Sequence, residues 1–295
     1  MRSYGCGKSE EQVLQVGIVG VGAMGREIAQ HISKAGHDVV AFDTSHDARQ
    51  ATAAAGLKVA DTLAETCRDM EVVLVMVATD AQAVSVITDL LDTGVADGTV
   101  IAVAATVHPL TMKDLEVPCS KAKVDLVDTP VCYGLQGAIA GELISLCGGP
   151  ASAIERIAPV LLSYSRSIEH LGPLGSGQIG KTCNNMMHWA ACVANYETLA
   201  LAKACGIDAQ EMRETLLKCP ARNTTLERWD TTRFTWHEKD MDVALDLAQR
   251  VDVPLPLFEA VDQLVKHLSP DAVKSLLYSD SAAYLGRPIE AGKLT

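Results

Sequence analysis

The sequence predicts an α/β fold in which a doubly wound parallel sheet is followed by an all-α C-terminal domain. Apolar strand patterns alternate with helical patterns from residue 14 to residue 169, which is typical of such sheets. Strand patterns stop after a segment rich in Gly and Pro at 172–177, and helices dominate beyond it. We therefore expect a disordered tail at 1–13, a first domain at 14–174 and an all-α substrate and oligomerisation domain at 175–295.

Composition excludes several classes of function. The 295 residues are 48% hydrophobic and 21% charged, as in globular proteins with substantial cores. A formal net charge of -12 without a basic cluster argues against binding nucleic acid, because neutralising phosphates requires clustered Lys and Arg. No apolar run approaches the roughly twenty residues of a membrane helix, and no signal peptide is evident. Nine cysteines without a C-x-x-C pair predict reduced thiols, a cytoplasmic protein and no metal site.

A dinucleotide fingerprint follows the first predicted strand, at 14–19. The sequence Gly20-Val21-Gly22-Ala23-Met24-Gly25 leads directly into a helical pattern that continues to residue 35. This order of strand, G-x-G-x-x-G and helix predicts a Rossmann-type NAD(P) site. The first glycine permits the tight turn, the second lets the backbone approach a pyrophosphate, and the third allows the helix to pack closely. The expected cofactor contacts here are Gly20, Gly22, Ala23, Met24 and Gly25.

The second predicted strand, at 38–43, ends in a carboxylate. Asp43 lies 21 residues beyond Gly22, the distance expected for an acid that accepts a hydrogen bond from a ribose hydroxyl. This charge would repel a 2′-phosphate, and no Lys or Arg directly follows it, so NAD is expected rather than NADP. The alternative interpretation is an ordinary turn aspartate after a strand.

The alternation of strands and helices then continues. Ligands of such a sheet bind at the carboxyl ends of its strands, so we expect cofactor contacts from Val77, Ala78, Thr79 and Thr106, with Thr106 also near the substrate. Turn capping is the alternative for both threonines. The remaining patterns predict a short strand and a capped helix at 59–63, strands at 71–78, 99–104, 124–128, 142–147 and 165–169, and helices at 80–91, 109–115 and 151–162.

The stretch 175–185 contains the candidate catalytic residues. Ser176 is a candidate N-cap of an apolar helix expected at about 176–205. Lys181 lies early in that helix, where the helix dipole and burial both favour a neutral amine that can exchange a proton. Asn185 is four residues further, on the same face, where its amide could hold a substrate oxygen, and His188 follows on this stripe. The alternative is a solvated lysine beside an ordinary polar face.

Together these segments resemble those of the β-hydroxyacid dehydrogenase family, which includes 3-hydroxyisobutyrate dehydrogenases and tartronate semialdehyde reductases. The resemblance covers residues 14 to 286 and rests on four ordered motifs: 20–25, Asp128-Thr129-Pro130-Val131, 175–185 and Lys239-Asp240. It implies hydride transfer between NAD(P) and a small β-hydroxy acid or related polar alcohol, in a homodimer or homotetramer. It further implies that Lys181 is the general acid/base, that Asn185 orients the substrate and that Lys239 approaches the nicotinamide. An exposed surface lysine is the alternative for Lys239.

One segment departs from the family pattern. After Asp-x-Pro-Val the family usually has Ser-Gly-Gly, which holds the substrate carboxylate, whereas this chain has Cys132-Tyr133-Gly134. We expect these three residues at the substrate. A thiol is a weaker donor than a hydroxyl, so either the head-group preference has changed or the Tyr133 phenol supplies the lost hydrogen bond. Two rival functions are a non-catalytic NAD(P)-binding scaffold or sensor and an imine reductase on the same architecture. The Lys181 and Asn185 pair favours the dehydrogenase.

Overall fold

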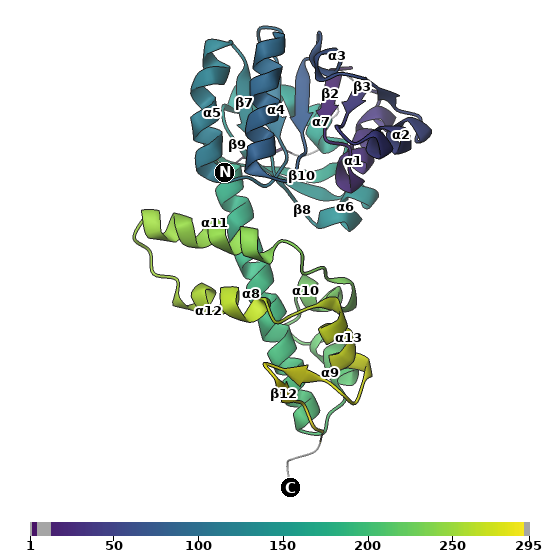
Figure 1. Ribbon diagram of the computed structural model, residues 1–295, viewed down its shortest axis with the longest axis vertical. Helices are drawn as coiled ribbons and strands as arrows, with labels where there is room; N and C mark the ends of the chain where they lie inside the picture. The colour runs from purple at the N-terminus through teal and green to yellow at the C-terminus, as the bar shows by residue number, and fades with distance from the viewer. Residues whose placement is uncertain (1, 5–12, 292–295) are drawn as a thin grey trace. The chain divides into compact units, whose positions relative to one another are not determined.

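The chain divides into two compact units, Met1–Lys181 and Thr182–Thr295, and each is described by itself. The computed structural model describes residues 2–4 and 13–291. The division falls at 181/182, after the predicted domain boundary at 174/175. The difference arises because helix α8 (Ser176–Ala204) begins against the sheet of the first unit (Figure 1), where its Gly177 lies beside the Leu146 carbonyl.

The first unit is built on one sheet with strand order β1-β10-β9-β7-β6-β5-β2-β3-β4. Its central strands run parallel and are β2 (Gln15–Val19), β3 (Asp38–Phe42), β4 (Lys58–Val59), β5 (Val72–Val75), β6 (Val100–Val103) and β7 (Asp125–Asp128). Strands β9 (Leu143–Gly148) and β10 (Ser165–Gly172) are parallel to each other, but β9 is antiparallel to β7. The predicted doubly wound sheet is thus confirmed, with an antiparallel edge.

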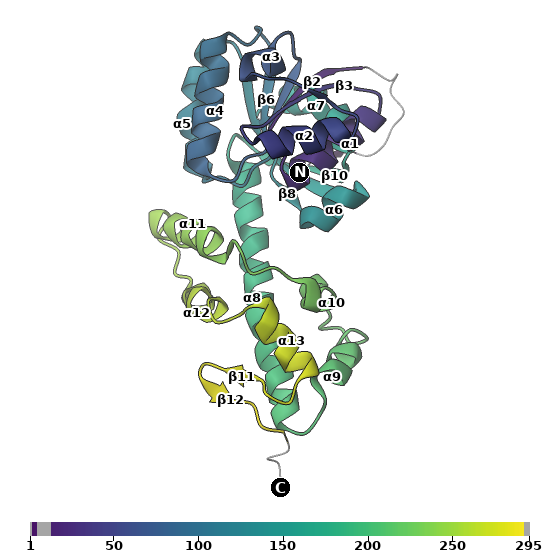
Figure 2. The ribbon, with the colours of Figure 1, turned by 45° about the vertical axis from the view of Figure 1, so that its right-hand side comes forward.

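Helices cover both faces of this sheet (Figure 2). The side chains of β2, β3, β5, β6 and β7 are divided between two apolar cores. In β5, Val72 and Leu74 join the core under α1, α6 and α7, while Val73 and Val75 join the core under α3, α4 and α5. Burial on both faces explains why the strands read as continuous apolar runs. The helices of this unit are α1 (Ala23–Lys34), α2 (His46–Ala54), α3 (Leu63–Cys67), α4 (Asp80–Thr93), α5 (Pro109–Lys121), α6 (Gly134–Ala140) and α7 (Ala151–Leu162).

Two segments differ from the sequence prediction. Arg2–Tyr4 forms β1, antiparallel to β10, so the disordered tail expected at 1–13 does not describe these three residues; residues 1 and 5–12 lie outside the described part of the chain. The edge strand β10 offers unpaired backbone groups, which is sufficient reason for a short strand to pair there. The glycine-rich segment after β7 contains strand β8 (Val131–Cys132) and helix α6, where the sequence showed no element.

The second unit is helical around a core of its own. Its helices pack through buried residues that include Trp189, Tyr196 and Trp229. A two-stranded hairpin, β11 (Ala283–Tyr284) with β12 (Arg287–Pro288), departs from the predicted all-α composition, because Leu285 and Gly286 adopt positive φ and close a tight turn. The further elements are α9 (Ala209–Leu216), α10 (Thr224–Glu227), a 3₁₀ turn at Trp229–Thr231, α11 (His237–Arg250), α12 (Pro256–Val265) and α13 (Pro270–Tyr278).

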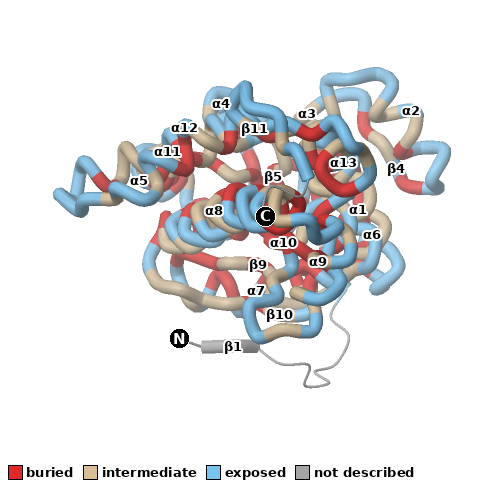
Figure 3. The backbone as a smooth tube through the Cα atoms, turned by 90° about the horizontal axis from the view of Figure 1, so that it is seen from below, coloured by how far each residue is buried: buried red, intermediate tan, exposed pale blue. Residues whose placement is uncertain are grey.

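The outer faces of the helices are polar with a few exposed apolar side chains. Helix α5 buries one residue per turn (Pro109, Met112, Leu115 and Cys119) and leaves most of the others exposed (Figure 3). None of the helices in the described part of the chain is long and apolar enough to cross a bilayer. Met187 and Leu201 of α8 are 68% and 65% exposed, and the homodimer or homotetramer that the family resemblance implies stays a prediction.

Candidate active site

The glycine turn between β2 and α1 has one open position and two crowded ones. A Cβ at Gly20 would lie 2.1 Å from the Met76 carbonyl oxygen, and a Cβ at Gly25 would lie 2.0 Å from the Gly20 oxygen. A Cβ at Gly22 would meet no atom within 4 Å, and no side chain caps the helix that starts at Ala23. The start of α1 therefore offers backbone N–H groups to an approaching anion, as dinucleotide-binding turns do. Met24 lies in the same first turn.

Asp43 follows β3 directly and is held beside this turn. Its Oδ2 accepts a hydrogen bond from the Val21 N–H at 2.9 Å, and its Oδ1 accepts one from the Ser45 N–H at 2.8 Å. Arg49 donates to the main-chain oxygens of Asp43 and Thr44, at 2.6 and 3.2 Å. The structure thus brings the predicted acid and the predicted glycine turn together.

The loops after β5 and β6 are joined by a carboxylate. Thr79 caps α4 in a capping box with Gln82, whose Oε1 also accepts from the Ala78 N–H at 2.9 Å. Thr79 therefore caps a helix, as the alternative interpretation held, and the cofactor contacts expected from Val77, Ala78 and Thr79 stay predictions. Asp80 Oδ2 accepts from the His108 N–H at 2.7 Å, which ties this loop to the one that carries Thr106.

Asp128 fixes the start of α8, a role that the sequence analysis did not assign. The side chain is fully buried, and it accepts hydrogen bonds from the N–H groups of Gly175 (2.7 Å, Oδ1) and Gln178 (2.8 Å, Oδ2). Ser176, expected as the N-cap, is instead the first residue of the helix. Burial raises the pKa of Asp128, and the backbone N–H groups of the helix start partly offset this. The sequence signal that could have indicated this role is an acidic residue at the end of a buried strand.

Two glycines allow the helix to approach the sheet this closely. A Cβ at Gly177 would lie 2.3 Å from the Leu146 carbonyl oxygen and 2.7 Å from Asp128 Oδ2. A Cβ at Gly148 would lie 2.5 Å from Asp128 Oδ1. Any side chain at these positions would push α8 away from β9. The glycine-rich start of the predicted catalytic stretch therefore has a packing explanation.

Lys181 lies half-buried in the second turn of α8, beside Cys132. Burial raises the pKa of the Cys132 thiol, and the positive charge of Lys181 opposes this effect, which places the two side chains within electrostatic reach. The structure therefore brings together two residues that lie far apart in the sequence. Asn185 follows one turn later on the same helix, and its Oδ1 accepts from Asn184 Nδ2 at 3.1 Å.

The side chain of Tyr133 is engaged elsewhere. Its phenol oxygen accepts a hydrogen bond from Arg166 Nη2 at 2.7 Å, and the guanidinium carbon lies 4.5 Å from the ring centroid. The ring packs against the core under α1, α6 and α7. The backbone of Tyr133 has φ of +86°, a left-handed conformation that favours glycine, and leads into α6 at Gly134. Cys132 is the side chain of this segment that lies within electrostatic reach of Lys181.

In the second unit, Lys239 is half-buried near the start of α11. Asp240, expected to fix Lys239, accepts a hydrogen bond from Trp189 Nε1 at 3.0 Å. His188, which shares the stripe of Lys181 and Asn185 in the sequence, has its Nδ1 3.0 Å from Thr225 Oγ1. The indole of Trp189 was not singled out from the sequence, because an aromatic residue on an apolar helix gives no sign of its polar partner.

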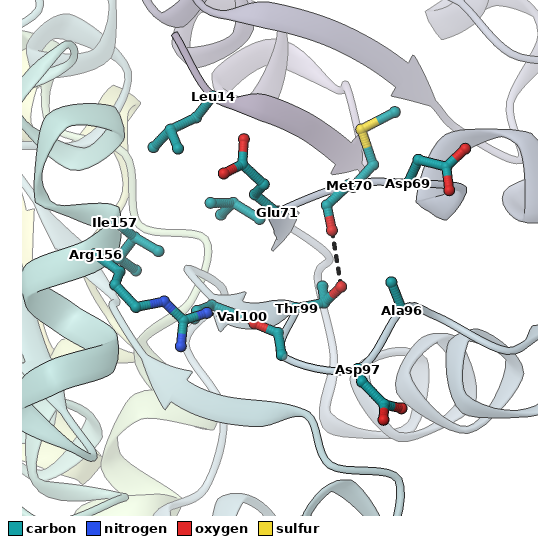
Figure 4. A pocket seen from close by; sticks show the side chains of 12 residues that line it. Leu14, Asp69, Met70, Glu71, Ala96, Asp97, Thr99, Val100, Arg156 and Ile157 are labelled. Atoms are coloured by element: carbon teal, nitrogen blue, oxygen red, sulfur yellow. Dashed lines mark hydrogen bonds between the residues drawn. The ribbon is translucent and has the colours of Figure 1, made fainter. Parts of the chain in front are cut away.

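A cavity of about 510 Å³ lies at the amino ends of β5 and β6, whereas the candidate site residues follow the carboxyl ends of the strands (Figure 4). None of the candidate site residues lines it. Its polar groups have partners within the fold: Thr99 Oγ1 donates to the Met70 carbonyl at 2.8 Å, and Arg156 pairs with Asp125 at 2.8 Å. We therefore assign no chemistry to it. Within residues 2–4 and 13–291, no three His, Cys, Asp or Glu side chains gather as metal ligands would.

Comparison with known proteins matches both units. The family model of the NAD binding domain of 6-phosphogluconate dehydrogenase covers residues 15–172. The model described as NAD-binding of NADP-dependent 3-hydroxyisobutyrate dehydrogenase covers residues 175–283. The two models follow each other without overlap and together span most of the described chain.

Individual relatives agree with these models. A 3-hydroxyisobutyrate dehydrogenase of Pseudomonas aeruginosa is 30% identical over 261 residues, which are 82% of this chain and 88% of the relative. An NAD-dependent L-serine dehydrogenase of the same organism is 30% identical over 217 residues, 72% of each chain. The structure of Mycobacterium tuberculosis 3-hydroxyisobutyrate dehydrogenase with L-serine has a TM-score of 0.80 at 24% identity, covering 91% of this chain and 100% of that one, which shows a shared fold.

Proposed function

The chain belongs to the β-hydroxyacid dehydrogenase family that includes the 3-hydroxyisobutyrate dehydrogenases, and from this premise we propose that Lys181 and Asn185 act on a small β-hydroxy acid. The enzyme is an NAD(P)-dependent oxidoreductase acting on a CH–OH group. The observation that carries the residue assignment is the position of Lys181, held near the start of α8 with Cys132 in electrostatic reach.

The glycine turn fits a dinucleotide on geometric grounds. Gly22 is the one glycine of the fingerprint whose missing side chain leaves open space, and it immediately precedes the uncapped start of α1. A pyrophosphate placed there would receive backbone N–H groups and the favourable helix dipole. Gly20, Gly22, Ala23, Met24 and Gly25 would hold it, with the backbone of 77–79 along the neighbouring strand end.

Asp43 supports NAD rather than NADP as the cofactor. Both of its oxygens are fixed by backbone N–H groups beside the glycine turn, so the negative charge has a defined place at the end of β3. That charge would accept from a ribose hydroxyl and repel a 2′-phosphate. Arg49, the neighbouring base, donates to main-chain oxygens, which holds the loop rather than offering a free phosphate site. A kcat/KM for NAD⁺ well above that for NADP⁺ is the expected result.

Lys181 provides the proton transfer in this proposal. The nicotinamide, when bound, accepts or donates the hydride. In oxidation a neutral Lys181 amine takes the proton of the substrate hydroxyl, and in reduction its ammonium returns a proton to the same oxygen. Asn185 lies four residues further on the helix, where its amide can hold that oxygen. Lys239 would add positive charge near the nicotinamide, and Trp189 would hold its neighbour Asp240.

The substrate class follows from the relatives and from Cys132. L-serine and 3-hydroxyisobutyrate both carry a hydroxymethyl group on the carbon that bears the carboxylate, and a substrate of this kind is proposed here. In the family pattern a serine hydroxyl binds the carboxylate; here a buried thiol within electrostatic reach of Lys181 stands at that position. Because a thiol is a weaker donor, the pocket should discriminate less strongly for a carboxylate, with Thr106 and the backbone of Tyr133 and Gly134 as the remaining contacts.

The test is a substrate panel with lysine variants. Small hydroxy acids, hydroxysulfonates, aromatic alcohols and a cyclic imine are screened by NADH absorbance, with NADP⁺ as comparison. Lys181→Ala and Lys181→Arg should both lower kcat by about 10²–10⁴-fold, since arginine keeps the charge but cannot release its proton. Lys113→Ala, which removes an exposed lysine early in α5, is the matched control and should leave kcat unchanged. Turnover retained by Lys181→Ala with cofactor still bound would refute the assignment.

A further inference from the structure

Gln178 is a fully buried side chain in the first turn of α8 whose carboxamide binds the loop after β6. Its Oε1 accepts a hydrogen bond from the Val107 N–H at 3.1 Å, and its Nε2 donates to the Ala105 carbonyl at 2.8 Å. These two backbone groups flank Thr106. Buried backbone groups in loops need partners, and a single side chain supplies both here.

The two hydrogen bonds of the Gln178 side chain follow the pattern found between neighbouring parallel strands. A residue in a parallel ladder donates to the carbonyl on one side of its partner and accepts from the N–H on the other side. The carboxamide of Gln178 makes this pattern with Thr106 as the partner. The N–H groups of Ala104 and Ala105 both donate to the Val75 carbonyl of β5, at 2.9 and 3.2 Å. The segment between the end of β6 at Val103 and Val107, which carries Thr106, is therefore hydrogen-bonded to β5 and to Gln178 of α8.

The other end of Gln178 is equally fixed. Its backbone N–H donates to Asp128 Oδ2 at 2.8 Å, and Asp128 is itself buried at the end of β7. The close approach of Gly177 to the Leu146 carbonyl prevents the helix from sliding away. Lys181 is three residues later on the same helix, about 4.5 Å further along its axis. Thr106 and Lys181 thus belong to one hydrogen-bonded block.

We propose that Gln178 is a positioning residue that sets the Thr106 loop against Lys181. The inference rests on the proposed function of Lys181 and deepens it. Hydride and proton transfer depend steeply on geometry, and a displacement of about 1 Å can lower the rate by roughly 10²-fold. Gln178 touches neither reacting group; it acts through the loop and the helix that it joins.

The first variant is Gln178→Met, which keeps the length of the side chain and removes both hydrogen bonds. It should lower kcat by about 10-fold to 100-fold, while the dissociation constant of the dinucleotide changes less than kcat, since Thr106 is only one of the expected dinucleotide contacts and the glycine turn and Asp43 lie on other strands. The matched control is Asn195→Leu, which removes a buried amide on the same helix that exchanges two hydrogen bonds with Asn223, at 3.1 and 3.2 Å. This variant loses stability but should keep kcat.

The second variant, Gln178→Glu, has a signature that lost stability alone does not give. A protonated carboxyl group can donate to the Ala105 carbonyl and accept from the Val107 N–H, whereas a carboxylate can only accept. Activity of this variant should therefore approach that of the wild type at low pH and fall as the new carboxyl group ionises. A pH profile of kcat that parallels the wild type at reduced level would contradict the positioning role.

Hydrogen exchange separates this inference from the proposed function. In Gln178→Met the amide of Val107 should exchange faster, while the peptide that contains Asn195 stays protected. If the Val107 amide exchanges at the same rate as in the wild type, Gln178 does not hold the loop, whatever the activity shows. If the amide is released and kcat equals that of the wild type, the positioning role fails although the hydride chemistry stands. If Lys181→Ala is as active as the wild type, the proposed function fails, and the exchange result still decides whether Gln178 holds the loop.

Discussion

Gly177→Ala should destabilise the first unit although alanine is the better helix former. In a helix interior the replacement of glycine by alanine ordinarily stabilises by about 1 kcal/mol. At Gly177 the new methyl carbon would lie 2.3 Å from the Leu146 carbonyl oxygen and 2.7 Å from Asp128 Oδ2. Neither neighbour is the end of a flexible side chain, because one is backbone and the other is fixed by two hydrogen bonds.

The expected magnitude follows from these contacts. Overpacking costs roughly 1–3 kcal/mol, and a lost hydrogen bond to the Asp128 carboxylate costs about 1.5–3 kcal/mol. Subtracting the gain in helix propensity leaves a net loss of roughly 1.5–5 kcal/mol, which corresponds to a fall in Tm of about 3–20 °C for a unit of this size. The displaced helix also moves Lys181, so kcat should fall by roughly 10²-fold.

Gly180→Ala is the matched control. It places a methyl group on the same helix three residues later, 2.3 Å from Leu171 Cδ1, the far end of a side chain that can rotate. Its cost should be largely offset by the gain in helix propensity. Thermal and urea unfolding of the wild type and both variants measures the difference. If Gly177→Ala proved as stable as Gly180→Ala, the close contact of α8 with β9 and Asp128 would not be what requires glycine at 177.

Two further predictions concern the cofactor and pH. Gly22→Ala should keep its Tm, because a Cβ there meets no atom within 4 Å. It should bind NADH at least about 10-fold more weakly in a fluorescence titration, because the methyl group occupies the space of the pyrophosphate. Gly25→Ala, whose methyl group clashes with backbone, should lose stability instead. Burial raises the folded-state pKa of Asp128 above the unfolded value of about 3.9, so the folded chain binds this proton more tightly, and the stability that Asp128 contributes falls as pH rises from about 4 through the raised pKa. The stability of Asp128→Asn relative to the wild type should therefore improve over that window in urea unfolding, and a pH-independent difference would contradict this.

Much of the fold could be predicted because local signals and burial agree. The all-apolar runs at 72–75 and 100–103 are strands buried on both faces, and their side chains pack alternately into two separate cores. The predicted strand at 71–78 extended too far, since 76–78 continue the apolar pattern but belong to the loop that Gln82 binds. Periodicity cannot distinguish the last residues of a strand from an apolar loop beyond it.

The segment after β7 shows where local signals fail. The sequence patterns predict no element between the strands at 124–128 and 142–147, and the structure has β8 and a short helix there. Tyr133 adopts a positive φ that sequence patterns assign to glycine, and Arg166, from a distant strand, holds its ring. A conformation maintained by tertiary contacts of this kind has no local signature. The hypothesis that the Tyr133 phenol replaces the serine hydroxyl stays a prediction; the Arg166 that donates to its oxygen is 33 residues away, which no local pattern could have indicated.

Most residues of the motif 175–185 position helix α8, and few of them are proposed to act on the substrate. Gly177 permits the approach to β9, and Gln178 links the helix to the loop of Thr106. Asp128 then accepts hydrogen bonds from the helix start, which partly offset the rise in its pKa that burial causes and anchor α8 on the strand next to β6. Only after these constraints does Lys181 follow, at a position fixed by one turn of helix. If Lys181 transfers the proton as proposed, three neighbouring strands set the distance of that transfer, and the same chemistry on an unanchored helix would lack that precision.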